Sequence, residues 1–233
     1  MGISAREAAH RAASDAEQVV WVDEQDQVLG GLPRAELRER GLIGRGSFIL
    51  LFNSRGELCV HRRTLSKALY PGYWDVTAGG MVGVGESYAE SAVRELHEEL
   101  GITGVALREH GRFYYEQPGN RLWGTVFSAV SDAPLVLQPE EVMEARFMPL
   151  EQVMHEVAVK DFCPDSLQAL QLYLSGTRTD PTPERRAPAR QRLPSWSLAL
   201  PPLNETGTDP GAGKKRTNRQ IPAFVQYSRT CCA

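Results

Sequence analysis

The sequence predicts an α/β sandwich, and three observations favour this fold class. Apolar runs of strand length recur between residues 19 and 148, separated by turns that contain Gly or Pro. Residues 87–100 have helical periodicity instead, and residues 150–156 and 164–174 read as two closing helices. Strands and helices intermixed along one chain are typical of an α/β sandwich rather than of an all-α or all-β domain.

The predicted elements follow in chain order. Residues 5–17 are polar and Ala-rich with no clear apolar stripe, so we expect a helix that docks loosely as an extension. A short helical stretch is expected from Pro33 to Arg40, because proline favours the first turn of a helix. The expected strands are residues 19–22, 47–53, 57–62, 74–78, 111–117, 122–130, 135–137 and 142–148.

Two turn sequences connect neighbouring strands. Ser54-Arg55-Gly56 separates the apolar run 47–53 from the next strand, which predicts a hairpin buried on at least one face. Pro118-Gly119-Asn120 is a second turn, between the extended runs on either side of it. Both turns therefore favour antiparallel neighbours.

The helix at residues 87–100 has recognisable ends. Ser87 is followed three residues later by Glu90, which matches a capping box and predicts the N-cap at Ser87. Gly101 is the expected glycine just after the last turn. Successive residues differ by 100°, so four apolar side chains fall within about 60° of each other and predict the core-facing stripe: Ala89, Val93, Leu96 and Leu100.

Composition divides the chain into three parts, an extension at 1–16, a domain at 17–175 and a tail at 176–233. The tail holds 8 of the 15 prolines, with 10 basic and 4 acidic residues, whereas residues 1–175 carry 16 basic and 25 acidic ones. Periodicity is lost in the tail, so we expect it to be disordered and without a dedicated function. We expect no specific nucleic-acid partner.

The chain shows no sign of secretion or of membrane insertion. Its four cysteines form no C-x-x-C pair and no disulfide framework, which fits a reducing compartment. Residues 1–18 contain no apolar signal segment, and no stretch approaches the ~20 apolar residues that span a bilayer. The sequence therefore predicts a cytoplasmic protein with no membrane partner.

Three glutamates on the predicted helix are the first candidate ligands for a metal ion. Glu95, Glu98 and Glu99 stand at i, i+3 and i+4, so they share one face, about 120° from the apolar stripe. Close carboxylates repel each other, and hard oxygen ligands at this spacing suit Mg²⁺ or Mn²⁺. A solvated acidic face is the alternative that the spacing alone favours.

The segment before this helix changes that balance. Residues 79–85 are a glycine-rich loop, which permits tight backbone geometry close to a ligand. The loop leaves Glu86 just ahead of the helix, beside the positive end of the helix dipole. Loop and helix together therefore favour a site for a metal ion and a diphosphate, since a divalent cation clamps diphosphate oxygens.

The stretch Gly80–Ile102, GMVGVGESYAESAVRELHEELGI, resembles the Nudix box, G-x5-E-x7-R-E-U-x-E-E-x-G-U, in which U is a bulky aliphatic residue. Every fixed position matches, at Gly80, Glu86, Arg94, Glu95, Leu96, Glu98, Glu99, Gly101 and Ile102. The resemblance extends over about residues 17–175 and implies an α/β/α sandwich around a mixed sheet. It also implies a hydrolase that attacks phosphorus with a metal-activated water.

The resemblance carries roles to individual residues. It implies that Glu95, Glu98 and Glu99 bind Mg²⁺, or Mn²⁺, and that the Gly80 carbonyl is an extra ligand. It implies an ion pair between Glu86 and Arg94 that holds the loop against the helix. The base is left open between a glutamate of the box and a carboxylate from elsewhere, for which Glu141 and Glu144 are candidates. The catalytic candidates are thus Glu95, Glu98, Arg94 and Glu141.

The substrate-binding candidates are Gly79 and Gly80 in the loop, and Arg62 and Arg63 at the end of a predicted strand. Arginine forks suit phosphate, although surface ion pairs are an equally strong alternative for these two. No histidine is assigned a role. The expected partner is a small phosphorylated substrate, and a homodimer is left open.

The span Ser47–Ala78 is similar to another group with the Nudix fold, the isopentenyl-diphosphate isomerases. It has an apolar strand, a turn, Arg62-Arg63, Lys67 and Pro71-Gly72-Tyr73-Trp74. The isomerases carry a catalytic Cys and a metal-binding His shortly after this Trp, and residues 75–80 contain neither. The sequence therefore favours a hydrolase. The alternatives are an isomerase-like enzyme and a nucleotide-binding module without turnover.

Overall fold

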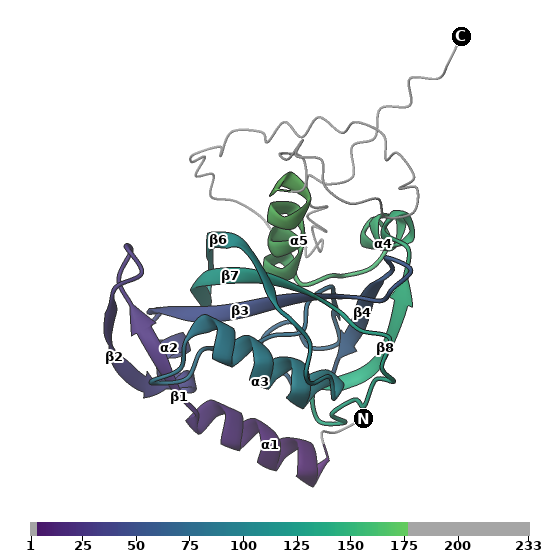
Figure 1. Cartoon of the computed structure of the whole chain (residues 1–233). Helices are drawn as coiled ribbons and strands as arrows, with labels where there is room; N and C mark the ends of the chain where they lie inside the picture. The colour runs from purple at the N-terminus through teal and green to yellow at the C-terminus, as the bar shows by residue number, and fades with distance from the viewer. Residues whose placement is uncertain (1–3, 177–233) are drawn as a thin grey trace, which may run out of the picture. The chain divides into compact units, whose positions relative to one another are not determined.

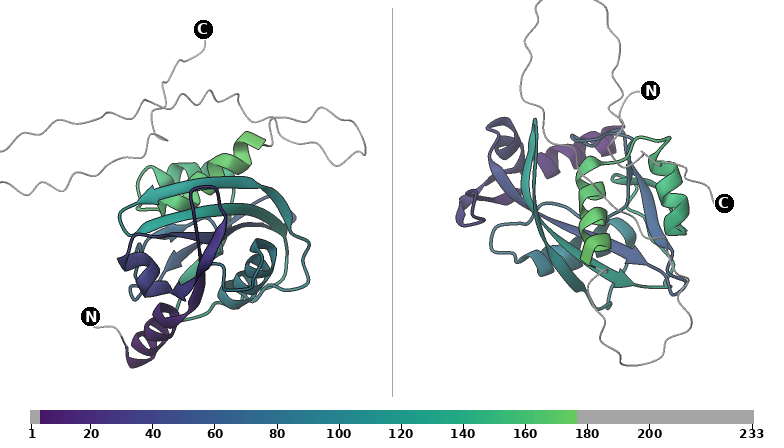
Figure 2. Two further views of the ribbon diagram at one scale, coloured as in Figure 1. Left: turned by 90° about the vertical axis from the view of Figure 1, so that its left-hand side faces the viewer. Right: turned by 90° about the horizontal axis from the view of Figure 1, so that it is seen from above.

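Strand β3 (Ile43–Phe52) is buried on both sides, because helices cover both faces of the sheet. Phe48 and Leu50 join a core cluster with side chains of α4 (Leu150–Val157) and α5 (Pro164–Gly176). Ile49 and Leu51 point the other way and pack with α3 (Tyr88–Leu100). This alternation explains the continuous apolar run, and it confirms the α/β/α sandwich (Figures 1 and 2).

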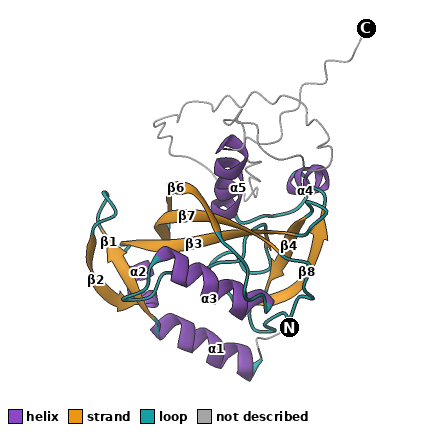
Figure 3. Ribbon diagram, viewed as in Figure 1, coloured by secondary structure: helices purple, strands orange, loops and turns teal. Residues whose placement is uncertain are grey.

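The computed structural model describes residues 4–176, and in this range the strands form one mixed eight-stranded sheet (Figure 3). β3 pairs in parallel with β7 (Asn120–Val130), which pairs antiparallel with β6 (Arg108–Gln117). At its start, β3 also pairs with β1, the partner of β2. β4 pairs antiparallel with β3, β5 and β8. The remaining strands are β1 (Gln18–Val22), β2 (Val28–Pro33), β4 (Leu58–Arg63), β5 (Trp74–Asp75) and β8 (Val142–Met148).

Three strand predictions differ from the structure. The strand expected at residues 74–78 is shorter and ends at Asp75. Residues 135–137 form no strand, because the Val136 and Gln138 amides donate to the carbonyls of Leu100 and Glu99 at the end of α3. The segment therefore caps a helix rather than extending the sheet. β2 was not predicted, since its Gly-Gly sequence has low strand propensity. Its pairing with β1 is a tertiary effect.

Helix α3 has the predicted ends but buries a different face. Ser87 accepts from the Glu90 amide in a capping box, and Gly101 has φ +71°, so both end signals are confirmed. The predicted stripe is wrong at Ala89 and Val93, which are exposed. The buried face runs through Tyr88, Ser91, Ala92, Glu95, Leu96, Glu99 and Leu100. The helix is turned so that two glutamates face inward.

The cap of α3 gives a first testable expectation. Ser87→Ala removes the hydroxyl that accepts the Glu90 amide at 3.2 Å, so one N–H of the first turn loses its partner. We expect the free energy of unfolding to fall by about 1 kcal/mol. Urea denaturation measures this change, and Ser87→Asp, which keeps an acceptor, serves as the control. Equal losses in both variants would contradict the capping role.

Helix α1 (Ala5–Ala16) has no buried residue, as expected for a polar helix, yet it is not a loose extension. Its last turn is bonded to α2 (Arg34–Glu39), with the Arg34 Nη1 atom donating to Ser14 at 3.0 Å and Arg38 pairing with Asp15. Its first half contacts the segment before β8 through an ion pair between Arg6 and Glu140. The expectation of loose docking is therefore wrong. It was based on the absence of an apolar stripe, and polar contacts such as these leave no apolar stripe in the sequence.

No helix within residues 4–176 combines the length and the apolar character needed to cross a membrane. Apart from Gly176, the tail expected to be disordered lies outside the described residues.

Candidate active site

The glycine-rich loop before α3 lies across the start of the sheet. The Ser47 amide donates to the Gly80 carbonyl at 2.9 Å, and the Val82 amide donates to the Arg45 carbonyl at 3.0 Å. The Val82 carbonyl in turn accepts the Val20 amide. The loop is thus hydrogen-bonded to both β1 and β3, and these bonds fix where α3 begins relative to the sheet.

Gly79 and Gly80 are glycines because neighbouring atoms leave no room for a side chain. A Cβ at Gly79 would lie 1.9 Å from the Ser47 carbonyl oxygen, and one at Gly80 would lie 2.2 Å from Glu95 Oε1. The Gly79 amide donates to Glu99 Oε2 at 3.1 Å. Both glycines therefore bring the backbone directly against the carboxylates of α3.

Arg94 connects the loop and the carboxylates. Its guanidinium makes a fork to Glu86, at 2.7 and 3.0 Å, which confirms the ion pair expected between these residues. It also donates to Glu95 at 2.8 Å, to Glu98 at 3.0 Å and to the Met81 carbonyl at 3.2 Å. Hydrogen bonding to Glu86 raises the pKa of Arg94, so this cation stays charged among the three carboxylates.

The three glutamates of α3 that are candidate metal ligands differ in exposure. The Glu98 side chain is 47% exposed, whereas the residues Glu95 and Glu99 are only 7% and 2% exposed. Glu99 lies away from the predicted apolar stripe and is nevertheless buried, because the helix turns it toward Gly79. Burial raises the pKa of Glu95 to about 7 and holds the pKa of Glu99 well above its usual range.

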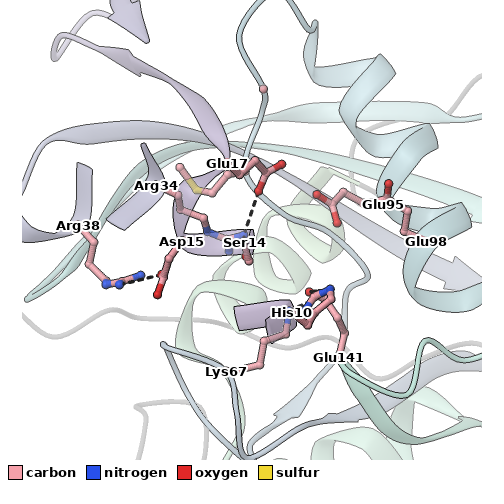
Figure 4. Close-up of polar contacts among 12 residues, drawn as sticks. His10, Ser14, Asp15, Glu17, Arg34, Arg38, Lys67, Glu95, Glu98 and Glu141 are labelled. Carbon is pink, nitrogen blue, oxygen red and sulfur yellow. Dashed lines mark hydrogen bonds and ion pairs between the residues drawn. The ribbon is translucent and has the colours of Figure 1, made fainter. Parts of the chain in front are cut away.

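Glu141 joins these groups from a distant part of the chain. Its carboxylate pairs with Lys67 Nζ at 2.7 Å and lies 3.8 Å from His10 Nε2 (Figure 4). Glu99 lies within electrostatic reach of this carboxylate. Although burial works to raise it, the Lys67 ammonium holds the pKa of Glu141 at about 2. Glu141 is therefore ionised at neutral pH.

The two loops that carry this ion pair are fastened to each other. The buried Thr64 hydroxyl donates to the Glu140 carbonyl at 2.8 Å, and the Thr64 amide donates to the Glu141 carbonyl at 3.0 Å. The Lys67 amide closes a turn on the Thr64 carbonyl. This local structure sets Lys67 opposite Glu141.

The two arginines at the end of β4 point in different directions, as side chains along a strand do. Arg63 lines the cleft and pairs with Asp75 at 3.3 Å, and its buried Nε atom has no hydrogen-bond partner. Arg62 does not line the cleft. It donates to the Gly72 carbonyl at 3.1 Å and lies 3.8 Å from Glu144 on a half-exposed surface. Of the two candidate arginines, only Arg63 lines the cleft, and of the two candidate bases, Glu141 and Glu144, only Glu141 does.

The cleft lies between α1, α2, the glycine loop and the two fastened loops. Gly79, Gly80 and Glu141 line it, while Glu95, Glu98 and Glu99 lie behind these residues, in contact with them or with Arg94. Lys67, which belongs to the isomerase-like span, lines it as well. Cationic or polar side chains that no sequence pattern singled out also line it: His10, Ser14, Arg34 and Arg38. The only available signal was the i, i+4 spacing of His10 with Ser14 and of Arg34 with Arg38.

Cys163 also lines the cleft, beside Asp75. Burial raises the pKa of this thiol well above its usual range, so the sulfur is protonated. A protonated thiol is a poor nucleophile. The cleft therefore gains no reactive cysteine from this residue.

The residues at this site fit a divalent cation in their chemistry. Glu95, Glu98 and Glu99 all offer hard oxygen ligands, and Glu95 and Glu99 are buried carboxyl groups whose negative charge, once they ionise, a cation would compensate. As the side chains stand, no three His, Cys, Asp or Glu groups among residues 4–176 converge on one ion position. Arg94 accounts for this, because it draws Glu95 and Glu98 toward itself.

Comparisons with known proteins agree with this arrangement. The NUDIX domain model matches residues 43–171, more than half of the chain. A Nudix hydrolase of Pseudomonas aeruginosa, itself uncharacterised, is 72% identical over 166 residues, 71% of this chain and 98% of that protein. The uncharacterised Nudix hydrolase YfcD of Escherichia coli K12 is 40% identical over 164 residues, 70% of this chain and 90% of YfcD.

The crystal structure of DR0079 from Deinococcus radiodurans superimposes with a TM-score of 0.59 at 28% identity. It covers 67% of this chain and 99% of that one. Family match, close relatives and fold together show that the chain belongs to the Nudix family and is a Nudix hydrolase. Enzymes of this family act on nucleoside diphosphate derivatives.

Proposed function

We propose that this Nudix hydrolase uses Mg²⁺, or Mn²⁺ in its place, to cleave the diphosphate bond of a nucleoside diphosphate linked to another moiety, or of a similar small phosphorylated substrate. One observation carries the proposal. Buried carboxylates of α3 press against the Gly79–Gly80 backbone from behind, while Lys67, Arg63 and Arg34 face the cleft in front. A cationic cleft next to ligands for a divalent ion suits a diphosphate.

Glu95, Glu98 and Glu99 would hold the ion, after Arg94 has given up its hydrogen bonds to the first two. The ion would supply charge neutralisation of the diphosphate and a more acidic water. Arg94 keeps its fork to Glu86 in either case, so it acts as a positioning residue for the loop and the helix.

The chain's own groups divide the remaining work. Lys67 binds a phosphate oxygen as a point charge, and Arg63 binds one through the part of its guanidinium that lines the cleft. Glu141 is ionised and accepts a proton from the attacking water once substrate has drawn Lys67 toward a phosphate. Arg62 and Glu144 pair outside the cleft, so the proposal gives them no part in these roles.

The proposal is tested by incubating the purified full chain with Mg²⁺ and a panel of nucleoside and isoprenoid diphosphates. We expect release of a monophosphate that stops when EDTA removes the metal. Isopentenyl diphosphate is followed for isomerised product in the same experiment. Isomerisation, or tight binding of a nucleotide without turnover, would overturn the hydrolase in favour of an isomerase-like enzyme or a binding module.

A further inference from the structure

Helix α2 carries two arginines toward the cleft on the side opposite the fastened loops. Arg34 and Arg38 are one turn apart, so they share a face of the helix. Both line the main cleft, and both also line an adjoining hollow with the apolar side chains of Leu37, Leu69 and Met81. They therefore stand where the cleft continues beyond Gly80.

Each guanidinium meets α1 through a single nitrogen. Arg34 Nη1 donates to Ser14 Oγ at 3.0 Å and lies 3.5 Å from a Glu17 carboxylate oxygen, and Arg38 Nη2 lies 3.0 Å from Asp15 Oδ1 (Figure 4). An arginine has five N–H donors, so these contacts use a minor part of the capacity of both groups. The side chains are only about a quarter exposed, at 26% and 23%.

A ligand can displace the polar groups at the end of α1 that pair with Arg34 and Arg38. No residue of α1 is buried, so the helix is docked by polar contacts. Its first half keeps separate attachments, from Arg6 to Glu140 and from His10 to Gln138. Asp15 and Glu17 can therefore yield the guanidinium groups to a stronger anion without releasing the whole helix.

We propose that Arg34 and Arg38 form a subsite for a phosphate of the substrate beyond the two phosphates that flank the scissile bond, with Asp15 and Glu17 as resident anions in its absence. This inference rests on the proposed function. Arg34 lies within electrostatic reach of both Glu95 and Glu141, which places the subsite next to the hydrolytic groups. The substrate class is then a compound with three or more phosphates.

Binding without turnover tests the subsite directly. The full chain is titrated calorimetrically in EDTA with inorganic tripolyphosphate and with pyrophosphate. We expect tripolyphosphate to bind about tenfold more tightly, and we expect Arg34→Gln and Arg38→Gln each to remove that advantage. Arg40→Gln is the matched control, because Arg40 pairs with Glu36 on the same helix and does not line the cleft. Equal binding of the two anions by the wild type would overturn the proposal.

Asp15→Asn separates a binding role of Arg38 from a structural one. If Asp15 is a resident competitor, its removal leaves the tripolyphosphate affinity unchanged or raises it. A loss as large as that of Arg38→Gln would mean that the pair merely holds α1, and the proposal would fail. Thermal melts of all variants show whether each is folded.

Kinetics distinguish this inference from the proposed function. With Mg²⁺, Arg38→Gln should raise KM about tenfold for a nucleoside triphosphate and leave KM for the corresponding diphosphate unchanged. Absence of all hydrolysis, together with arginine-dependent tripolyphosphate binding, would refute the hydrolase and keep the subsite. Hydrolysis in which both substrates are equally affected would refute the subsite and keep the hydrolase.

Discussion

Glu98→Gln should lower kcat by about 100-fold or more and leave the melting temperature unchanged. The Glu98 side chain is 47% exposed and contacts Arg94 alone among the described hydrogen bonds, so an amide of the same shape costs little stability. A Gln removes the charge that a divalent ion requires, and metal ions supply several kcal/mol of charge stabilisation in such reactions. Hydrolysis at saturating substrate and Mg²⁺ measures the effect.

Glu99→Gln should behave in the same way for a different reason. Burial raises the pKa of Glu99 well above its usual range, which favours the neutral carboxyl group in the absence of a metal, and an amide resembles that form. We therefore expect a similar fall in kcat with a small change in stability. The control for both variants is Glu151→Gln, an exposed residue in the first turn of α4. Full activity of Glu98→Gln or Glu99→Gln would exclude that residue as a ligand.

The second large effect is expected from Gly79→Ala, which should destabilise the protein by about 3 kcal/mol and also reduce kcat. A methyl group here would lie 1.9 Å from the Ser47 carbonyl oxygen, which is backbone of the central strand and cannot rotate away. The loop would have to shift, and the hydrogen bond from the Gly79 amide to Glu99 would be lost with it. Urea denaturation and steady-state kinetics measure the two losses.

Gly83→Ala is the matched control in the same loop. Its added methyl group would meet Glu86 Oε2 at 3.3 Å, which is the tip of a side chain rather than backbone, so a small shift relieves the contact. We expect a loss below about 1 kcal/mol and nearly unchanged kcat. Equal stability of the Gly79 and Gly83 variants would show that the close backbone approach at Gly79 is unimportant.

Some parts of the site follow from local sequence. The spacing of Arg94, Glu95 and Glu98 sets their relative positions because they lie on one helix, and a capping box and a glycine mark its two ends. The glycine-rich loop is continuous with that helix, so the ion pair between Glu86 and Arg94 was also predictable. Each of these features depends on residues no more than eight positions apart in the chain.

The direction in which the helix faces could not be predicted from its apolar residues. Tyr88 and Ala92 proved to be buried in place of Ala89 and Val93, and Glu99 turned inward with them. Hydrophobic periodicity assumes that apolar side chains alone occupy the buried face. In α3 this assumption fails, because the buried face also holds Glu99, whose carboxylate accepts a hydrogen bond from the Gly79 amide.

Local sequence patterns alone determined the fold class, the family and the choice of Glu95, Glu98 and Glu99 as candidate metal ligands. Tertiary structure alone decided that Lys67, Glu141 and the arginines of α2 share a cleft, that Arg63 enters it while Arg62 leaves it, and that α1 borders it. The physical reason is the range of the interactions. Helix caps and helical spacing act within a few residues, whereas the cleft is assembled from segments as far apart in the chain as His10 and Asp165. Burial of the sheet's two faces brings these segments together.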